Sequence, residues 1–454
     1  MHKVLVANRG EIACRVIRGC RALGLSAVAV HSEADAAALH VELADEAHAI
    51  GPPKPQESYL KAETIIETAR KAGADAIHPG YGFLAENASF ARMVQDAGLI
   101  WVGPRPATIE DMGDKERARL LAKSAGVPIL PGSPRFPEND LAGLDEAAAE
   151  VGFPLLVKAS AGGGGIGMRL VEAPEDLQKV VVATQGMAAR SFGDGTVFLE
   201  RYVRKARHIE IQVFGFGDGH AVHLFERECS IQRRFQKIIE ETPAPGLPAA
   251  TRQAMAEAAV ALAKQERYRG AGTVEFVVDA ESNAFFFLEM NTRIQVEHPV
   301  TEMTTGLDLV ALQLRLAAGE ELSALTQDSV AQQGHAIECR IYAENPDKMF
   351  LPSPGTLERL AFPAEGDGLR IDSGVREGDK ITPFYDPMIA KMVAHAMDRA
   401  GAIERLRTAL AATALEGLVC NIAFLIRVLE HPSFARGDTH TSFVEAHKAD
   451  LIAG

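Results

Sequence analysis

Four consecutive glycines, residues 162–165, lie between two strand-like segments at 155–158 and 168–171. Each glycine costs conformational entropy on folding and has no side chain to bury, so packing does not explain the run. A glycine loop can instead bring several backbone N–H groups close to a polyphosphate. No Gly-Lys-Ser or Gly-Lys-Thr follows, so the loop is not a Walker A motif. We favour a phosphate-binding loop over a flexible linker, because linkers do not normally join two strands directly.

Two glutamates and an asparagine form the next candidate site. Glu275 lies in a predicted strand at 273–278, and Glu289 and Asn291 follow a second one at 285–288, across a turn at 281–283. A hairpin would bring Glu275 and Glu289 together. Carboxylate and amide oxygens are hard ligands that suit Mg²⁺ held together with nucleotide phosphates. Two solvent-facing glutamates on a hairpin are the alternative, and these residues alone favour neither.

Three polar residues recur at every second position directly afterwards: Arg293, Gln295 and Glu297. They share one face if this segment is extended. A guanidinium, an amide and a carboxylate could together bind a small oxyanion and remove its proton. An ordinary exposed polar face is the alternative. We expect the adjacent His298, which precedes Pro299, to be structural.

Positive charge is concentrated in a chain whose formal net charge is −14. Two short segments carry the basic residues Arg201, Arg204, Lys205, Arg207 and His208, then Arg227, Arg233, Arg234 and Lys237. Glutamates are interleaved with them, so we expect part of this charge to form a solvated, mutually paired surface. The remainder is what a pocket for an anionic substrate needs.

Alternating strands and helices must position these groups. Apolar segments at 4–7, 26–30, 75–78 and 99–102, with a helical pattern at 11–22, indicate a parallel sheet with right-handed crossovers. A single helix is predicted at 109–125. Alternation of apolar and polar residues at 209–214 and 273–278 predicts half-buried antiparallel strands in the middle of the chain.

Composition limits the class of function. The acidic excess makes nucleic acid and anionic membranes unexpected partners, and no stretch approaches the ~20 apolar residues of a membrane span. Five cysteines without a CxxC pair favour a reducing compartment. Because neither a secretory signal nor a transit peptide is recognisable, we expect a soluble cytoplasmic protein, or one of the mitochondrial matrix if a transit peptide has been removed.

Four motifs together resemble one known family, the biotin carboxylases of the ATP-grasp superfamily. They are VANRGEIA at 6–13, HPGYGFL at 78–84, ERECSIQRR at 226–234 and EMNTRIQVEHPV at 289–300. The resemblance covers nearly the whole chain and implies an α/β fold, α+β overall. It implies a Rossmann-like N-terminal domain at 1–113 and an ATP-grasp domain at 114–330 with a mobile glycine-lid subdomain at 130–202. A mixed α+β C-terminal domain would occupy 331–454.

Members of this family carboxylate biotin through a carboxyphosphate, using ATP, bicarbonate and Mg²⁺ or Mn²⁺. By position, the resemblance implies ATP-binding roles for Lys115, Lys158, Gly163, Gly164, Gly165, Glu200, Val203, His208 and Gln232. It implies a metal site of Glu275, Glu289 and Asn291. Bicarbonate and biotin would be bound by Lys237, Arg293, Gln295, Val296, Tyr81, Gly82 and Arg340. Glu297 would be the catalytic base, acting with Arg340, Lys237 and Arg293.

The segments at 372–379 and 383–388 resemble the α-chains of acyl-CoA carboxylases, particularly the methylcrotonyl and propionyl types. Such an enzyme works with a biotin carboxyl carrier domain or protein and with a carboxyltransferase subunit. The sequence lacks an Ala-Met-Lys-Met biotinylation motif, so we expect a carrier outside these residues to supply the biotin. Pairing as a homodimer is a further expectation.

Two positions depart from the family pattern: Ile166, where Lys or Arg is usual, and Phe235, where His is usual. A neutral hydrogen bond lost at 235 is worth ~0.5–1.5 kcal/mol, so we expect a working enzyme with altered nucleotide affinity or lid closure. Two alternatives are another ATP-grasp ligase, such as a carbamoyl-phosphate type, and a nucleotide-binding regulator with impaired turnover.

Overall fold

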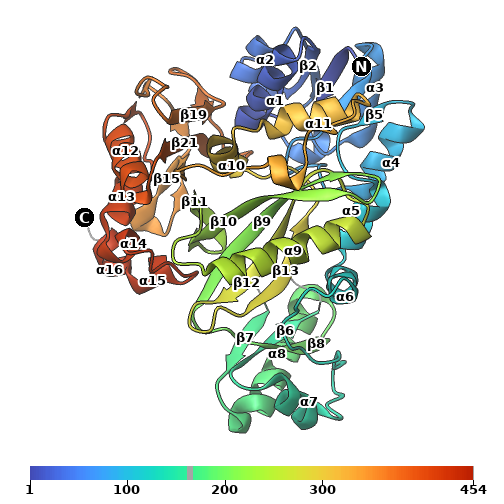
Figure 1. Ribbon diagram of the computed structural model, residues 1–454, viewed down its shortest axis with the longest axis vertical. Helices are drawn as coiled ribbons and strands as arrows, with labels where there is room; N and C mark the ends of the chain where they lie inside the picture. The colour runs from blue at the N-terminus through green and yellow to red at the C-terminus, as the bar shows by residue number, and fades with distance from the viewer. Residues whose placement is uncertain (161–166, 453–454) are drawn as a thin grey trace.

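The computed structural model describes residues 1–160 and 167–452. Its N-terminal sheet has five parallel strands in the order β3-β2-β1-β4-β5. The strands are β1 (Lys3–Val6), β2 (Ser26–Ser32), β3 (Glu46–Gly51), β4 (Ala76–His78) and β5 (Ile100–Trp101); the helices are α1 (Gly10–Ala22), α2 (Leu39–Leu43), α3 (Ala62–Lys71) and α4 (Ala88–Asp96). This confirms the Rossmann-like arrangement, which is blue in Figure 1. Because β1 and β4 are neighbours, the segments that follow them meet at one edge of the sheet.

The single helix predicted at 109–125 is wrong. Two helices occupy this stretch, α5 (Pro106–Gly113) and α6 (Lys115–Ser124). Asp114 between them has extended backbone angles, φ −88° and ψ 111°, and its side chain accepts a hydrogen bond from the Arg117 N–H. An aspartate that caps the second helix therefore interrupts a pattern that reads as continuous.

The central sheet has eight antiparallel strands in the order β13-β12-β9-β10-β11-β14-β21-β19. They are β9 (Ala206–Phe216), β10 (Ala221–Arg233), β11 (Gln236–Thr242), β12 (Arg269–Asp279), β13 (Phe285–Asn291), β14 (His335–Tyr342), β19 (Leu369–Ser373) and β21 (Met388–Ala396). The ladder between β11 and β14 runs from Ile239 opposite Cys339 to Thr242 opposite Ala336. The sheet therefore continues from the middle of the chain into its C-terminal part, as Figure 1 shows.

The expectation of half-buried strands in this sheet is wrong. All residues from Ile209 to Gly215 on β9 and from Gly270 to Phe276 on β12 are buried. Helix α9 (Ala249–Gln265) packs on β9 and β10, and α10 (His298–Thr305) and α11 (Leu309–Ala317) also pack on the sheet. The alternation thus separates an apolar buried face from a polar buried face, and the polar one carries the candidate site.

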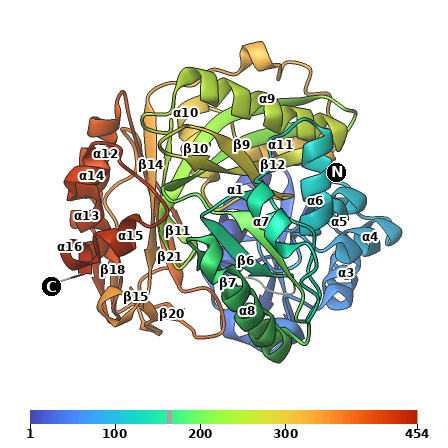
Figure 2. The ribbon, with the colours of Figure 1, turned by 90° about the horizontal axis from the view of Figure 1, so that it is seen from below.

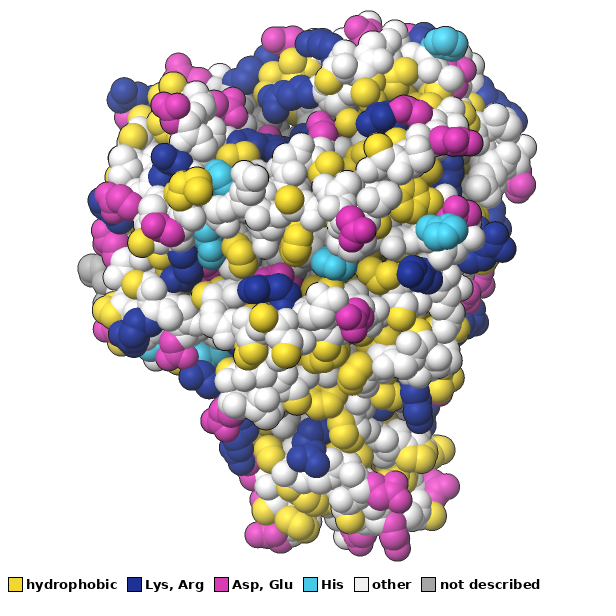
Figure 3. All heavy atoms as spheres, in the orientation of Figure 1, with side chains coloured by type: hydrophobic (Ala, Val, Ile, Leu, Met, Phe, Trp, Pro, Cys, Tyr) yellow, Lys and Arg dark blue, Asp and Glu magenta, His cyan; other side chains and the backbone are white. Residues whose placement is uncertain are grey.

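A small subdomain protrudes at the bottom of Figure 1 and lies toward the viewer in Figure 2. Its sheet has the order β7-β6-β8, with β6 (Leu155–Ala159), β7 (Met168–Val171) and β8 (Val197–Arg201), and it carries α7 (Leu144–Val151) and α8 (Leu177–Phe192). A separate apolar core, including Leu144, Val157 and Val181, holds it together. Figure 3 shows it as a narrower lobe, with basic and acidic side chains intermingled over this face of the molecule.

The C-terminal part packs α12 (Arg399–Ala411) and α13 (Ile422–Glu430) over β14 and β21. Short elements complete it: β15 (Glu344–Asn345), β16 (Leu351–Pro352), β17 (Gly355–Thr356), β18 (Arg359–Ala361), β20 (Lys380–Ile381), β22 (Ala414–Glu416), α14 (Pro432–Ala435), α15 (Phe443–Ala446) and α16 (Lys448–Ile452). The domain boundaries predicted at residues 113 and 330, and the lid subdomain predicted at 130–202, stay predictions. Within the described ranges, the helices are too short or too polar to cross a membrane.

Candidate active site

Strand register lines up charged residues across the central sheet. Arg227 on β10 is opposite Glu210 on β9, Glu210 is opposite Glu275 on β12, and Glu275 is opposite Glu289 on β13. Side chains at paired positions point to the same face, so these four form a row. The predicted contact between the strands of Glu275 and Glu289 is confirmed. Glu210 is a further carboxylate that the sequence analysis did not single out.

The ammonium of Lys237 is at the centre of this row. Its Nζ donates to Glu210 Oε2 at 2.6 Å, to Glu275 Oε1 at 2.7 Å and to Glu297 Oε1 at 2.7 Å. The three N–H bonds of the ammonium are therefore all used. Although burial disfavours its charge, the surrounding carboxylates raise the pKa of Lys237 well above its ordinary value. Lys237 is a fixed cation where the predicted metal and bicarbonate residues meet.

Arg227 supports the same row from within the sheet, and its side chain is fully buried. Its five N–H groups donate to Glu210 Oε1 (2.6 Å), Gln212 Oε1 (2.6 Å), Gln295 Oε1 (3.0 Å), Thr273 Oγ1 (3.1 Å) and Thr301 Oγ1 (3.1 Å). Part of the basic cluster does form a paired surface, as the exposed ion pair of Arg204 with Glu172 confirms. Arg227 instead fixes the positions of Glu210 and Gln295.

Residues 292–297 connect β13 to α10 and end in a turn at 296–297, so the condition of an extended segment, under which Arg293, Gln295 and Glu297 would share one face, is not met. Strand β13 ends at Asn291, and Glu297 is the N-cap of α10 with φ −81° and ψ 9°. The connection brings both Gln295 and Glu297 to the carboxylates around Lys237. Gln295 Nε2 donates to Glu275 Oε1 at 3.0 Å, and Glu297 Oε1 accepts from Lys237 Nζ. His298 is buried, and its Nδ1 lies 2.7 Å from the Gln295 carbonyl oxygen, which agrees with a structural role.

Glu297 connects Lys237 to Arg340. Its Oε2 accepts a hydrogen bond from Arg340 Nη2 at 3.0 Å, and the same nitrogen is 2.6 Å from Glu240 Oε1. Although burial favours the neutral acid, Lys237 and Arg340 hold the pKa of Glu297 below its ordinary value. Burial raises the pKa of Glu240 to about 7. Glu297 is therefore an ionised carboxylate placed to accept a proton.

Arg293 connects the N-terminal part to the metal-ligand set. Its Nε donates to Glu86 Oε2 at 2.9 Å, and its Nη2 donates to Asn291 Oδ1 at 2.9 Å. Glu86 was not singled out from the sequence. The structure thus places Arg293 beside the predicted metal ligand Asn291.

Tyr81 reaches the site from the edge of the N-terminal sheet. Asn8 Nδ2, just after β1, donates at 2.7 Å to the carbonyl oxygens of Pro79 and Tyr81, just after β4. Gly80 has φ +63°, and a Cβ there would lie 2.9 Å from Asn8 Nδ2, so this approach requires glycine. The Tyr81 hydroxyl donates to the Glu11 carboxylate. Gly82 follows it, exposed and with φ +69°.

The predicted metal ligands present a donor set of the right chemistry. Asn291 Nδ2 donates to Glu275 Oε1 at 2.9 Å, and His208 Nε2 is 2.8 Å from Glu275 Oε2. Withdrawal from bulk water and the neighbouring Glu275 carboxylate raise the pKa of Glu289. Two crowded carboxylates beside an amide oxygen favour a bound cation, so these residues fit Mg²⁺ or Mn²⁺.

Predicted nucleotide contacts lie on both the small subdomain and the central sheet. Lys158 Nζ on β6 donates to Glu200 Oε1 on β8 at 2.7 Å. Lys115 is the exposed first residue of α6, which packs on β13. Val203 lies in the connection between β8 and β9. Gln232 Nε2 is 2.8 Å from His208 Nδ1 on the central sheet.

The phosphate contacts predicted for Gly163, Gly164 and Gly165, and the departure at Ile166, lie outside the described residues. Phe235, the other departure, is 68% exposed in the two-residue turn between β10 and β11. Both turn residues have positive φ, +48° for Arg234 and +67° for Phe235, as hairpin turns of this length require. The Phe235 side chain therefore projects into solvent.

The sequence analysis did not identify Glu210 or Glu240 as site residues, and it did not predict that Arg227 is buried. A partial signal was present, because β9 carries His208, Glu210 and Gln212 at alternate positions and β12 carries Thr273 and Glu275 in the same way. In a sheet covered on both sides, such a face must pair internally.

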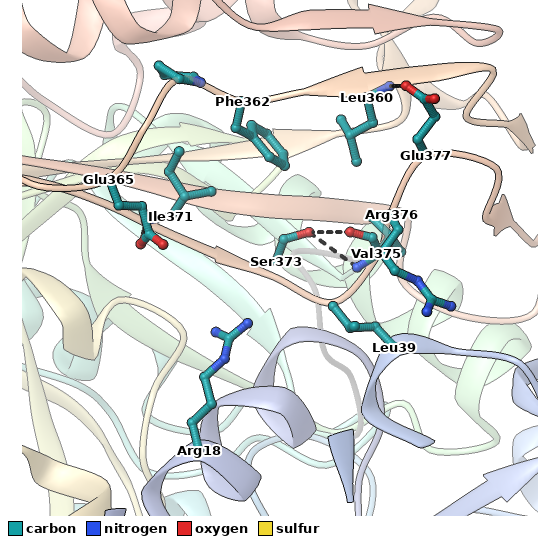
Figure 4. A pocket seen from close by; sticks show the side chains of 11 residues that line it. Arg18, Leu39, Leu360, Phe362, Glu365, Ile371, Ser373, Val375, Arg376 and Glu377 are labelled. Carbon is teal, nitrogen blue, oxygen red and sulfur yellow. Dashed lines mark hydrogen bonds between the residues drawn. The ribbon is translucent and has the colours of Figure 1, made fainter. Parts of the chain in front are cut away.

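A cavity of about 360 Å³ lies apart from this cluster, between the N-terminal part and the segment 360–377. Figure 4 shows Arg18 and Leu39 on one side of it and Phe362, Ile371 and Ser373 on the other. Its eleven lining residues include none that the sequence analysis assigned to the site.

Three family models match successive parts of the chain. The model for the biotin carboxylase N-terminal domain matches residues 1–109, and that for the biotin carboxylase C-terminal domain matches 338–446. Between them, the model for the carbamoyl-phosphate synthase L chain ATP binding domain matches 114–325. The two flanking matches distinguish this chain from the carbamoyl-phosphate type of ligase considered above.

Full-length similarity agrees with these matches. A biotin carboxylase of Halalkalibacterium halodurans is 52% identical over 448 residues, which are 98% of this chain and 97% of that protein. The mitochondrial methylcrotonoyl-CoA carboxylase subunit alpha of Mus musculus is 50% identical over 450 residues, which are 99% of this chain but 62% of that protein. The chain thus spans less than two thirds of the second relative.

Among solved structures, the biotin carboxylase domain dimer of the Hydrogenobacter thermophilus 2-oxoglutarate carboxylase is similar with a TM-score of 0.90 at 45% identity. The match covers 99% of this chain and 98% of that one, which was solved with MgADP, ADP and bicarbonate.

Proposed function

The chain belongs to the biotin carboxylase family, and from this premise we propose that the cluster around Lys237 is its active site. The activity is ATP- and bicarbonate-dependent carboxylation of biotin. One observation carries the assignment of the site: Lys237 joins Glu275, of the metal-ligand set, to Glu297, of the bicarbonate set, at 2.7 Å each.

We assign the chemistry as follows. Lys237, Arg293, Gln295 and the Val296 backbone hold bicarbonate, and Glu297 takes its proton. The bicarbonate oxygen attacks the γ-phosphorus of ATP, ADP leaves, and carboxyphosphate forms. Carboxyphosphate releases CO₂ and phosphate beside biotin; the released phosphate takes the ureido N–H proton, and the ring nitrogen then attacks CO₂ to give carboxybiotin. Arg340 stabilises the enolate oxygen of that ring, and Tyr81 with Gly82 borders it.

The remaining residues position ATP. Phosphoryl transfer needs alignment and charge neutralisation more than covalent help. Glu275, Glu289 and Asn291 would hold Mg²⁺, which would supply part of that neutralisation. Lys115, Lys158 and His208 face the phosphates, Glu200 and Val203 the adenine, and Gln232 the ribose. Since Lys158 and Glu200 are paired at 2.7 Å, nucleotide binding replaces this ion pair with contacts to the ligand.

The whole assembly is inferred from relatives. Biotin arrives on a carrier domain or protein, and a carboxyltransferase passes the carboxyl group to an acyl-CoA, with methylcrotonoyl-CoA favoured by the relative in Mus musculus. A homodimer is proposed from the dimeric Hydrogenobacter thermophilus domain. The free thiols of the described cysteines agree with a reducing compartment, the cytoplasm or, after removal of a transit peptide, the mitochondrial matrix.

ATP hydrolysis tests the proposal directly. Hydrolysis should require bicarbonate and rise with free biotin, and Glu297→Ala should lower it by ~10²–10⁴-fold, the usual contribution of a general base. Glu241→Ala is the control, because Glu241 lies on the same strand as Glu240 but faces the opposite side of the sheet. Stimulation by an amine in place of biotin would favour another ATP-grasp ligase. Equal biotin-dependent activity in Glu297→Ala and the native chain would refute the assigned base.

A further inference from the structure

Lys391 on β21 is a fully buried lysine that the mechanism above does not use. Its Nζ donates to the Val296 carbonyl oxygen at 2.8 Å, and it lies 3.2 Å from Glu11 Oε2 and 3.8 Å from Asp372 Oδ2. These three partners come from the bicarbonate turn, from α1 and from β19. Removing an ammonium from water is costly, and an apolar side chain would avoid that cost. Its contacts therefore indicate a role beyond packing.

The first contact fixes the bicarbonate turn. Val296 immediately precedes Glu297, so the hydrogen bond from Lys391 restrains the peptide next to the base. Lys391 is also directly opposite Arg340 in the ladder between β14 and β21. Paired residues share a face of the sheet. Lys391 therefore lies beside Arg340, which contacts Glu297 and is assigned to biotin.

The second contact leads to the biotin side of the site. Glu11 is in the first turn of α1, and its other oxygen accepts the hydrogen bond from Tyr81. Gly374, just beyond β19, presses against this turn, since a Cβ there would lie 2.2 Å from the Glu11 nitrogen. The close approach of backbone to backbone keeps Glu11 next to Lys391. A continuous path thus runs from Val296 through Lys391 and Glu11 to Tyr81.

The third contact adds a support behind the turn. Asp372 Oδ2 accepts from Arg370 Nη2 at 2.7 Å, and Arg370 Nη1 donates to Glu302 Oε2 at 2.7 Å. Glu302 belongs to α10, the helix that Glu297 caps. Lys391 is therefore linked to the turn both directly and through the helix that follows it.

We propose that Lys391 is a positioning residue that, through Glu11, holds the bicarbonate turn and the biotin-bordering Tyr81 in one fixed relation. The inference rests on the proposed function, because it assigns the two ends of the path to bicarbonate and biotin. It predicts that loss of Lys391 weakens the use of bicarbonate and of biotin together, while the ATP contacts on the opposite side of Lys237 are unaffected.

Steady-state kinetics of the full chain test it. For Lys391→Met, the KM for bicarbonate in ATP hydrolysis and the KM for free biotin should each rise at least about tenfold, the value of one charged hydrogen bond. The KM for ATP should stay within about twofold, since no ATP contact changes. Arg399→Met is the matched control: Arg399 also pairs with a buried carboxylate of this sheet, Glu241, at 2.6 and 2.9 Å, but on the opposite face. It should change none of the three KM values.

If the Lys391→Met chain does not fold, a second pair of variants provides the test. Lys391→Met with Glu11→Gln removes both charges together, and Glu11→Gln alone keeps the lysine. Both should raise the KM for bicarbonate and biotin while leaving that for ATP. Equal rises in all three KM values, or a rise for one of bicarbonate and biotin alone, would overturn the role of Lys391. If the native chain itself shows no bicarbonate-dependent ATP hydrolysis, the proposed function fails, a result distinct from any change between variants.

Discussion

The central sheet and the small subdomain around β6, β7 and β8 hold their charged groups in opposite ways. In the central sheet, Lys237 is 12% exposed and contacts three carboxylates, and Arg227 is fully buried with five hydrogen bonds. In the subdomain, the pair of Lys158 and Glu200 is partly exposed, and Glu172 pairs at the surface with Arg204, which lies in the connection between β8 and β9.

Under the proposed function, this difference corresponds to two tasks. Groups that act on bicarbonate must keep their geometry before the substrate arrives, and a saturated buried network provides that. Groups that close over a nucleotide must change partners, and partly exposed pairs are replaced at low cost. The contrast predicts that substitutions in the sheet affect stability and chemistry, whereas those in the subdomain affect nucleotide affinity.

The largest expected effect is on folding. Arg227→Met leaves Glu210 buried without its arginine, so the free energy of unfolding should fall by ~3–5 kcal/mol. Arg204→Met, the matched change in an exposed pair, should cost less than ~1 kcal/mol. Chemical denaturation of both variants measures the difference, and equal losses would break the contrast between the two regions.

The next effect is a dependence of stability on pH. Burial raises the pKa of Glu240 from 4.5 to about 7, so the folded state binds its proton more tightly than the unfolded state. Stability from this group is present below pH 4.5 and lost as the pH rises through 7. Glu240→Gln cannot ionise, so its stability relative to the native chain should rise by up to roughly 3 kcal/mol over that window.

Urea denaturation between pH 4.5 and 8 measures this change. Glu172→Gln is the control from the exposed pair of the subdomain, and it should follow the curve of the native chain. A Glu240→Gln curve parallel to that of the native chain would show that Glu240 keeps its charge in the folded protein.

A third effect concerns nucleotide affinity. Lys158→Met removes a charged donor from the subdomain, so the KM for ATP should rise about tenfold or more, equivalent to ~1.5–3 kcal/mol. The melting temperature should change little, because the pair with Glu200 is partly exposed. A melting temperature lowered as much as that of Arg227→Met would mean that the subdomain depends on buried charge too.

The smallest effect is expected at Phe235. Phe235→His adds a neutral donor at an exposed turn, so the KM for ATP should fall by no more than about tenfold, for ~0.5–1.5 kcal/mol. Stability should be unchanged, since the side chain projects into solvent. Phe235→Leu, which adds no donor, serves as the control. Identical KM values for the two variants would remove Phe235 as a reason for altered affinity.

The sequence was sufficient for the order of the elements and for the hairpin that pairs Glu275 with Glu289, because period and turn residues are local signals. It was insufficient for the burial of Arg227, since alternating polar residues on β9 and β12 mark a polar face but do not by themselves show that helices and neighbouring strands bury it. The interruption at Asp114 was missed because one capping side chain ends a pattern that reads as a continuous helix. Lys391 depends on three distant segments meeting, which no local pattern encodes.

The ladder between β11 and β14 has a consequence for exchanging parts between relatives. A chimaera that changes parent between β11 and β14 combines strands of two origins in one hydrogen-bonded ladder and in the core that Ile239 and Ile337 share. Crossover points in the connections that flank the small subdomain, just after α6 and after β8, leave that ladder intact and keep the core of the subdomain whole. Modules of this protein are thus exchangeable where a lobe with its own core is attached, and inseparable where a sheet is shared.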